Sequence, residues 1–386
     1  MTAARVSAPT EPESASTAGP AGAAAGGVKA AGGMWSLRWR GVSMRVHRRT
    51  AWVCAWCLAF AGVLLVVSLC TGAYAVAPAQ VARALFFGTG DRLAVFFVTQ
   101  ERLPQALLAL LVGCALGVSG AVFQNLSRNP LASPDVIGFN SGAATGAIAV
   151  LVVGGSSAQV AVGAIGGGLA TAAVVFLLAS RGGLNGVRLV LIGLGVTAML
   201  GSVNSYLLTR STLHNAQNAH IWLIGTLSGR SWGAVQVMAV ALAVLLPVSV
   251  VMGRRLRMLE MGDDLARGLG VGVGRSRLVL TVLGVGLCAV AVANAGPVPF
   301  VALAAPQIAM LVARSPGVSL TAAGASGALL LSAAHLVSNQ VLHLFARLQL
   351  ADDTQQDSQL PVGVTTAVLG GVYLAWVLFR RRRTTV

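Results

Sequence analysis

Long apolar runs alternate with short polar segments along the chain from residue 51 to about residue 380. A helix needs about 20 mainly apolar residues to cross a bilayer, so these runs predict membrane spans. We predict ten spans, at residues 51–76, 103–124, 138–153, 159–179, 188–208, 232–252, 278–295, 300–313, 318–345 and 361–379. The runs are too long and too uniform for barrel strands. The predicted fold class is therefore an all-α polytopic membrane protein with about ten transmembrane helices.

The composition agrees with a membrane protein. Hydrophobic residues make up 56% of the chain and charged residues only 10%, whereas a soluble domain carries about 25% charged residues. The formal net charge of +16 comes mostly from arginines between the predicted spans and near the two ends. A nucleic-acid binder would gather such charge on one folded face, so here the charge is a topology signal.

The arginine positions indicate the orientation of the spans. With the N-terminus inside the cell, 19 arginines fall in inner segments and 6 in outer segments. Basic segments stay on the cytoplasmic side of a membrane. We therefore predict a multi-pass protein of the cytoplasmic membrane, with both termini and residues 254–277 in the cytoplasm.

The chain divides into three predicted parts. Residues 1–50 form a cytoplasmic tail, disordered to about residue 33 because Ala, Gly, Pro, Ser and Thr dominate it, and ending in a basic collar from Arg38 to Arg49. Residues 51–380 form the transmembrane domain, and residues 381–386 a basic cytoplasmic end. The first apolar run exceeds the usual length in a signal peptide and follows a long tail, so we interpret it as a span.

Few side chains in the predicted spans could perform chemistry. All five cysteines lie in apolar runs, where Cys54-x-x-Cys57 is interpreted as helix packing rather than as a redox motif. Lys, Arg, Asp and Glu are absent from mid-span positions, and His335 and His343 are the nearest exceptions. An ion-coupled carrier usually needs a buried ionisable group, and an enzyme needs a cluster of reactive groups. We therefore predict no catalytic residue and no metal site, and we expect energy to enter through a loop.

Turn-forming and helix-packing residues follow one another through the second and third predicted spans. Pro104 suits the first turn of a helix, where its missing N–H costs nothing, and Asn129-Pro130 is typical of a turn. Gly113 and Gly117 have the spacing that lets helix backbones approach closely. The residues of this run that we single out are Pro104, Gly113, Gly120, Gln124, Asn129, Pro130, Pro134, Asp135 and Gly138.

This run resembles the permease family of ABC importers for iron–siderophores, haem and vitamin B12. Members of that family carry Arg-Leu-Pro-Arg, then Ser-Gly-Ala-x-Phe/Met-Gln, then Asn-Pro-Leu-Ala-x-Pro-x-x-Leu-Gly. The corresponding segments are residues 102–105, 119–124 and 129–138. The resemblance covers about residues 50–380, and residues 135–142 are most similar to the ferric-enterobactin members. It implies the type II ABC importer permease architecture.

Residues 254–277 form the one long charged segment between apolar runs. We expect Gly262 to end one short helix and Asp263 to cap the next, where carboxylates favour the positive N-terminus. We expect Leu265, Ala266 and Leu269 to form an apolar ridge for a partner. The resemblance implies that this segment is the coupling element toward an ATPase. The residues assigned to coupling are Gly262, Asp263, Asp264, Leu265, Ala266, Arg267, Leu269 and Gly270.

Two later segments resemble family motifs less completely. The matching residues are Gly296, Pro297, Pro306, Pro361 and Gly363. Gln307 stands where the family has His, and Met310 stands where it has Arg. Gln307 can still form hydrogen bonds, so a packing role survives this change, whereas a specific proton or cation role does not.

The resemblance also implies contacts on the outer face. Arg102 matches the first of the arginines that dock a solute-binding protein, Gln105 replaces the second, and Arg347 is a third candidate. A Gly-x4-Gly-Lys-Ser/Thr loop is absent from the sequence, and its only lysine is Lys29. A separate subunit is therefore expected to hydrolyse ATP.

The resemblance thus predicts a permease subunit, not an enzyme, that imports ferric siderophores of the catecholate type by ATP-driven alternating access. Haem or cobalamin is the alternative substrate, and an ion-coupled carrier is a distant alternative. The implied partners are two ABC ATPase subunits that bind ATP and Mg²⁺, a second permease subunit with a heterodimer favoured, and an extracytoplasmic siderophore-binding protein. No cofactor and no nucleic acid are expected on this chain.

Overall fold

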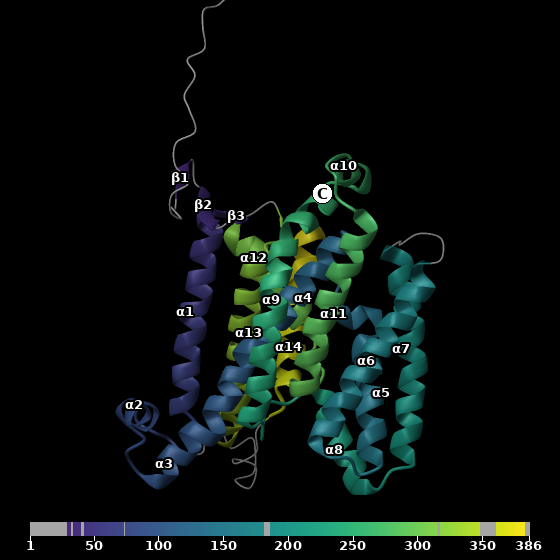
Figure 1. The fold of residues 1–386 in the computed structure, drawn as a ribbon. Coiled ribbons are helices and arrows are strands. Elements are labelled where there is room, and N and C mark those ends of the chain that lie inside the picture. The colour runs from purple at the N-terminus through teal and green to yellow at the C-terminus, as the bar shows by residue number, and fades with distance from the viewer. Residues whose placement is uncertain are drawn as a thin grey trace, which may run out of the picture. The chain divides into compact units, whose positions relative to one another are not determined.

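A computed structural model of the chain describes residues 29–31, 34–39, 42–72, 74–180, 186–314, 317–347 and 360–382 (Figure 1). The described residues fall into two units, which divide between Arg48 and Arg49. The second unit is built from helices alone in its described part, as the apolar runs predicted. The first unit contains strands, which the sequence pattern did not predict.

Each of the ten predicted spans is a helix in the structure. These helices are α1 (Arg48–Cys70), α4 (Leu103–Ser127), α5 (Phe139–Val152), α6 (Ser157–Ser180), α7 (Gly186–Thr209), α9 (Trp232–Glu260), α11 (Val273–Ala295), α12 (Val301–Ala313), α13 (Leu320–Arg347) and α14 (Val362–Arg382). Among the described residues, 7 helices are long and apolar enough to cross a membrane. The described apolar parts of α5, α12 and α14 are shorter.

Several short helices connect these spans. They are α2 (Pro78–Phe87), α3 (Arg92–Phe96), the π-helix η1 (Phe97–Arg102), the 3₁₀-helix η2 (Pro134–Ile137), α8 (Leu213–Ile224) and α10 (Asp263–Gly268). Helix α10 lies at one end of the bundle, whereas α2, α3 and α8 lie at the other (Figure 1). The two ends are called here the α10 face and the α8 face.

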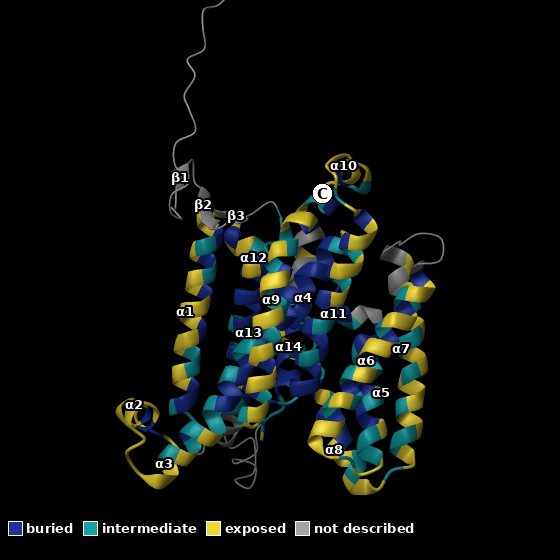
Figure 2. Ribbon diagram, in the orientation of Figure 1, coloured by how far each residue is buried: buried dark blue, intermediate teal, exposed yellow. Residues whose placement is uncertain are grey.

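Helix α4 is the centre of the bundle. It packs against α9, α11, α12 and α13, and most of its residues are buried (Figure 2). Gly113 and Gly117 lie against the carbonyls of Gly327 and Ala323 on α13, so closely that a Cβ at either glycine would clash with the backbone. These two glycines therefore let the backbones of α4 and α13 approach closely within one chain. The same arrangement joins α5 to α6 through Gly146 and its neighbours.

The connection between α4 and α5 enters the middle of the bundle. Gly138, at φ +80°, ends η2 and leads into α5, and a Cβ there would lie 3.0 Å from Oγ1 of Thr197 and 3.8 Å from Cγ2 of Thr171. Thr197 and Thr171 lie near the middle of α7 and α6. Asp135 therefore lies within the depth of the bundle, which corrects the sequence expectation that no aspartate occupies a mid-span level.

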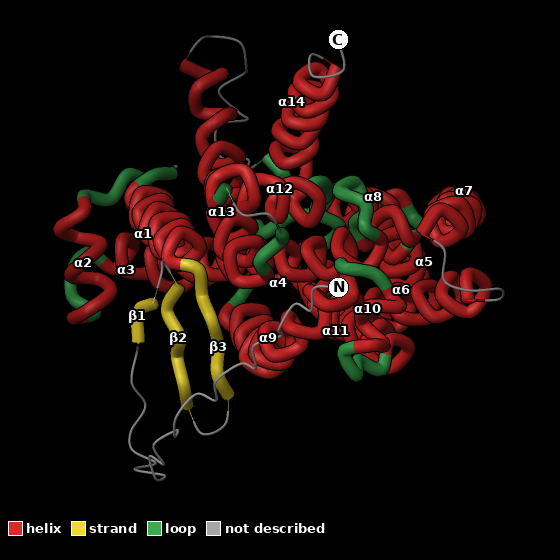
Figure 3. Tube along the Cα trace, turned by 90° about the horizontal axis from the view of Figure 1, so that it is seen from above, coloured by secondary structure: helices red, strands yellow, loops and turns green. Residues whose placement is uncertain are grey.

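The first unit contains a three-stranded antiparallel meander (Figure 3). Its strands are β1 (Lys29–Ala31), β2 (Met34–Trp39) and β3 (Val42–His47). They occupy the part of the sequence assigned to the end of the tail and the basic collar. Residues 1–28, the bulk of the predicted disordered tail, lie outside the described residues.

Candidate functional site on the α10 face

The charged segment 254–277 is mostly helical. Helix α9 continues through Arg254 to Glu260, and α11 already begins at Val273. Between them α10 is a short helix bounded by two glycines with positive φ, Gly262 at φ +119° and Gly270 at φ +79°. Glycine adopts these angles without the strain that a Cβ would cause, so the two residues set where the chain turns into and out of α10.

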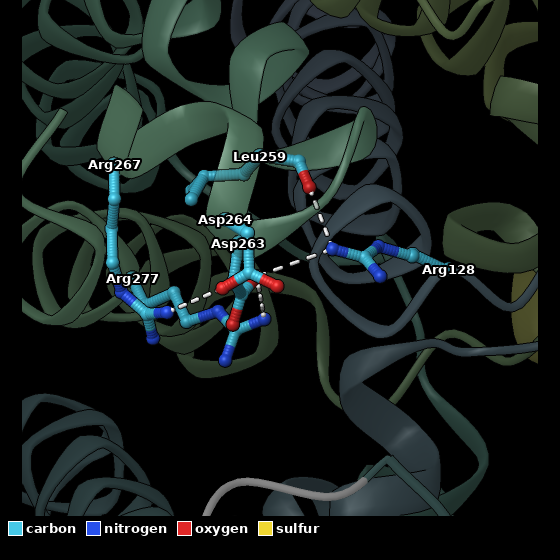
Figure 4. A network of polar contacts seen from close by, with 6 residues as sticks. All are labelled: Arg128, Leu259, Asp263, Asp264, Arg267 and Arg277. Atoms are coloured by element: carbon cyan, nitrogen blue, oxygen red, sulfur yellow. Dashed lines mark hydrogen bonds and ion pairs between the residues drawn. The ribbon is translucent and has the colours of Figure 1, made fainter. Parts of the chain in front are cut away.

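Asp263 is the centre of a polar network at this turn (Figure 4). Its Oδ1 accepts hydrogen bonds from Nη2 of Arg277 at 2.9 Å and from Nη2 of Arg128 at 3.2 Å. Nη2 of Arg128 also donates to the carbonyl of Leu259 at 2.9 Å. These contacts join the end of α4, the last turn of α9, the start of α10 and the first turns of α11. The expected capping role of Asp263 is wrong, because Gly262 is the N-cap of α10 and the Asp263 carboxylate binds arginines of other helices instead.

Arg128 is positioned for this contact by the end of α4. It is the C-cap of that helix and adopts a left-handed conformation at φ +50°. The following turn is held by Asn129, whose Oδ1 accepts a hydrogen bond from the N–H of Leu131 at 3.0 Å. Left-handed backbone is uncommon for a residue with a Cβ, so the turn is held in place by its surroundings. The Asn129-Pro130 motif thus places an arginine beside α10.

The outer surface of α10 is apolar at three positions. Leu265 and Leu269 are each 61% exposed, and Met261, just before the helix, is 68% exposed. Ala266 is fully buried against the bundle. The predicted ridge therefore contains Leu265 and Leu269 but not Ala266, and Met261 joins it. We refer to Met261, Leu265 and Leu269 as the α10 ridge.

Asp264 and Arg267 flank the α10 ridge and form an ion pair that is separate from the Asp263 network and more exposed to solvent. Their side chains form an i,i+3 ion pair at 2.8 Å, with side-chain exposures of 98% and 63%. An ion pair so open to solvent contributes little to stability. The Asp263 pairs are more enclosed, because the Arg277 side chain is 20% exposed and that of Asp263 is 29% exposed.

On the α8 face, Arg102 is engaged inside the chain. Its Nη1 donates to the carbonyl of Leu69 at 3.0 Å and its Nη2 to the carbonyl of Tyr74 at 2.6 Å. The guanidinium also lies 5.9 Å from the centre of the Phe97 ring. A hydrogen bond to Asp91 at 2.9 Å raises the pKa of Tyr74 and fixes this loop. Arg102 therefore ties the end of α1 to the start of α4, and its docking role stays a prediction.

The two other outer positions named from the sequence lie differently. The Gln105 side chain is only 1% exposed, so this position does not face an outside partner in this chain. Arg347 is the last residue of α13, and its side chain lies outside the described residues. A docking surface for a binding protein thus remains a prediction at both arginines.

The motif glutamines join α4 to α12 inside the bundle. Nε2 of Gln124 donates to the carbonyl of Leu303 at 2.9 Å, and Nε2 of Gln307 donates to Oε1 of Gln124 at 2.7 Å. Gln307, which stands at the family's His position, thus has a packing role. Gly120 completes this contact, because it lies directly against the carbonyl of Ala302.

The later motif residues also lie at close backbone contacts. Gly296, at φ +74°, has the carbonyl of Trp222 2.5 Å from where its Cβ would be. Gly363 lies directly against the carbonyl of Ile224. Pro306 is buried within α12. The remaining motif prolines stand at chain turns: Pro104 at the start of α4, Pro130 after it, Pro134 at the start of η2, Pro297 before α12 and Pro361 before α14.

Asp135 has one hydrogen-bonded side-chain partner among the described residues. Its Oδ1 accepts from Nδ2 of Asn140 at 2.5 Å. The described part of the chain contains no group of three or more His, Cys, Asp or Glu side chains that could hold a metal ion. The network that joins several helices and borders an exposed apolar ridge is the one around Asp263, so we take the α10 face as the candidate functional site.

Comparison with known proteins agrees with this arrangement. The model of the FecCD transport family matches residues 58–380. The chain is 42% identical over 330 residues to the ferric enterobactin transport system permease protein FepG of Escherichia coli (strain K12), covering 83% of this chain and 96% of that protein. It is 34% identical to the vitamin B12 import system permease protein BtuC of Escherichia coli O9:H4 (strain HS), covering 83% of this chain and 92% of that protein.

The fold has a solved counterpart. A chain of an ABC transporter described as being of the metal-chelate type, in an inward-facing conformation, superimposes with a TM-score of 0.72. The two chains are 25% identical, and the match covers 86% of this chain and 99% of the other. The helix arrangement described above is therefore that of an ABC transporter's membrane subunit.

Proposed function

This chain belongs to the FecCD transport family and is a permease of an ABC importer for substrates of the iron–siderophore type; we propose that it carries ferric catecholate siderophores of the enterobactin kind by ATP-driven alternating access. The 42% identity to a ferric enterobactin permease supports the substrate class. Haem or cobalamin is the alternative substrate, because two other relatives are named as hemin transport and vitamin B12 import permeases.

The observation that carries the mechanism is the arrangement of the α10 ridge over the Asp263 network. Leu265 and Leu269 are exposed side chains on a short helix, ready to enter a groove on a partner. The opposite side of α10 is tied to α4 and α11 by ion pairs to Asp263. A force on the ridge is therefore passed to the central helix of the bundle, which is what an ATPase must achieve to change the access of a transport path.

The proposed assembly assigns a partner to each face of the chain. Two ABC ATPase subunits bind ATP and Mg²⁺ and contact the α10 ridges. A second permease subunit completes the path, and we favour a different chain over a second copy. An extracytoplasmic siderophore-binding protein delivers the substrate, with Arg102 and Arg347 as candidate docking residues. Such charges chiefly set docking rate and register.

The proposed orientation places the α10 face in the cytoplasm. The arginines divide 19 to 6 in favour of that side, which supports both termini being cytoplasmic. Cysteine substitutions on either face, probed in intact cells with a membrane-impermeant thiol reagent, test this. Labelling at Leu213 on α8 but not at Leu265 is expected, and the reverse result contradicts the orientation.

The experiment that tests the function compares Leu265→Arg with the intact chain in uptake of radio-iron-loaded siderophores. Leu213→Arg is the matched control, because Leu213 is 76% exposed and lies on the opposite face. We expect Leu265→Arg to lose both uptake and co-purification with the ATPase subunit at normal membrane levels, and Leu213→Arg to retain co-purification. Unchanged uptake in Leu265→Arg overturns the assignment of the α10 ridge. No siderophore uptake by the intact chain, with uptake of haem or cobalamin, overturns the substrate class.

A further inference from the structure

The β1–β3 sheet comes directly before the first membrane-spanning helix. Strand β3 ends at His47 and α1 begins at Arg48, with no residue between them. One residue advances the chain by about 3.3–3.6 Å, so chain continuity alone keeps the end of β3 next to the start of a span. The family match begins at residue 58, so the sheet lies outside the matched part of the chain.

The strand register separates the sheet into two unlike faces. Directly paired residues of an antiparallel sheet share a face, and successive residues alternate between faces. On one face the β2–β3 pairs are Trp35 with Val46, Leu37 with Met44 and Trp39 with Val42. On the other face they are Met34 with His47, Ser36 with Arg45 and Arg38 with Ser43. The first face is apolar at all six positions, and the second is polar or basic at five of six.

Strand β1 and the residues that connect the strands fit the same pattern. In β1, Ala30 pairs with Trp35 and so belongs to the apolar face, whereas Lys29 pairs with Ser36 on the basic face. Two residues separate each pair of strands, Gly32-Gly33 and Arg40-Gly41. Glycine in a two-residue connection is typical of tight hairpins, so sequence and register agree.

An apolar face of this kind needs a covering surface. Removing apolar side chains from water is favourable, so packing the apolar face stabilises a small sheet. Three observations point to lipid as the cover. The face carries two tryptophans, which favour the membrane interface; basic residues occupy the reverse face; and the next residue along the chain enters a span.

We propose that the β1–β3 sheet lies on the inner surface of the membrane, with its apolar face in the interfacial layer and its basic face at the level of anionic lipid headgroups. An amphipathic element inserts its apolar face by about 5–10 Å, so the opposite face of a thin sheet stays at headgroup level. Anionic lipid headgroups attract basic residues that lie near the membrane surface. Arg38 and Arg45 hold register positions on the basic face, so they supply the charge that anionic headgroups attract. The proposal uses the orientation given above but neither the substrate nor the ATPase contact.

The test uses the full chain in nanodiscs, with its five native cysteines replaced by alanine and one new cysteine carrying a spin label. The label is placed on the apolar face by Leu37→Cys or Met44→Cys, and on the basic face by Ser36→Cys or Ser43→Cys. Accessibility to oxygen reports depth in lipid, and accessibility to a nickel chelate reports water. In discs containing phosphatidylglycerol we expect positions 37 and 44 to be oxygen-accessible and positions 36 and 43 to be nickel-accessible.

Two matched variants test whether lipid, rather than a protein surface, covers the apolar face of the sheet. Leu37→Asp is expected to make the label at Met44→Cys nickel-accessible, whereas Ser36→Asp is expected to leave it in lipid. Replacing Arg38 and Arg45 by Glu is expected to lose insertion in phosphatidylglycerol discs. Equal nickel accessibility at all four label positions overturns the proposal. Protection of positions 37 and 44 from both reagents also overturns it, because a protein surface rather than lipid then covers the face.

Discussion

Replacing Asp263 with asparagine removes one charge from the network that holds α10 to the bundle. The side chain keeps its size and one acceptor oxygen, so packing at the turn is preserved. Two ion pairs are lost, to Arg277 at 2.9 Å and to Arg128 at 3.2 Å. The hydrogen bond from Arg128 to the Leu259 carbonyl does not involve the altered group and is expected to remain.

The magnitude follows from how open these pairs are to solvent. The side chains of Arg128, Asp263 and Arg277 are 48%, 29% and 20% exposed, so solvent screens both pairs in part. Each pair is then worth about 0.5–1 kcal/mol, near the upper end for partly exposed pairs. The sum, about 1–2 kcal/mol, lowers the equilibrium constant for the held position of α10 by about 5–30-fold.

The assay is ATP-dependent uptake at matched membrane levels, together with ATPase activity of the purified complex. For Asp263→Asn we expect uptake to fall by up to that factor while ATP hydrolysis continues, because the ridge is intact but α10 is held less tightly to the bundle. The matched control is Asp264→Asn, which removes an exposed pair with Arg267 and keeps both Asp263 ion pairs, so a clearly smaller loss of uptake is expected. Equal losses in the two variants, or none in Asp263→Asn, would refute the transmission argument.

Three further predictions concern the helix packing, the turn before α10 and a hydrogen bond from the first residue of α9. Gly117→Val is expected to abolish the folded bundle, measured as loss of a monodisperse peak, because its side chain would collide with α13, whereas Gly62→Val, with nothing near its Cβ, is expected to be tolerated. Gly262→Ala is expected to reduce uptake several-fold at normal membrane levels, because φ +119° disfavours any Cβ. Trp232→Phe is expected to cost about 1 kcal/mol, seen as a lower melting temperature, because the indole donates to the Thr99 carbonyl at 3.0 Å.

The long helices could be predicted because apolar runs of span length have one stable solution in a bilayer. The α8 helix could not be predicted in this way, because its 12 residues are too few for a span and mix Leu213 with His214 and Asn215. The strands before α1 were not predicted for a different reason. Apolar and polar residues alternate in residues 34–47, but the arginines of the same segment also fit a basic segment beside a membrane span.

Side-chain roles at the site depended on contacts between distant segments. Asp263 follows a glycine, which fits a capping role by local reasoning, yet Arg128 lies 135 residues earlier and only the fold brings the two together. Ala266 and Leu265 are neighbours, so composition alone could not separate the buried residue from the exposed one. Arg102 was assigned an outside partner, and the carbonyls of Leu69 and Tyr74 that bind it carry no sequence signal.

The glycine contact between α4 and α13 has a consequence for how the protein is made. Helix α4 ends at Ser127, and α13 begins at Leu320, which the ribosome adds 193 residues later. At about 5–20 residues per second, the central helix spends roughly 10–40 s in the membrane before its closest partner exists. Its glycine face meets lipid during that time, so the most enclosed helix of the finished protein meets its closest partner only late in synthesis. Truncation before α13 should therefore leave α4 exposed to membrane quality-control proteases.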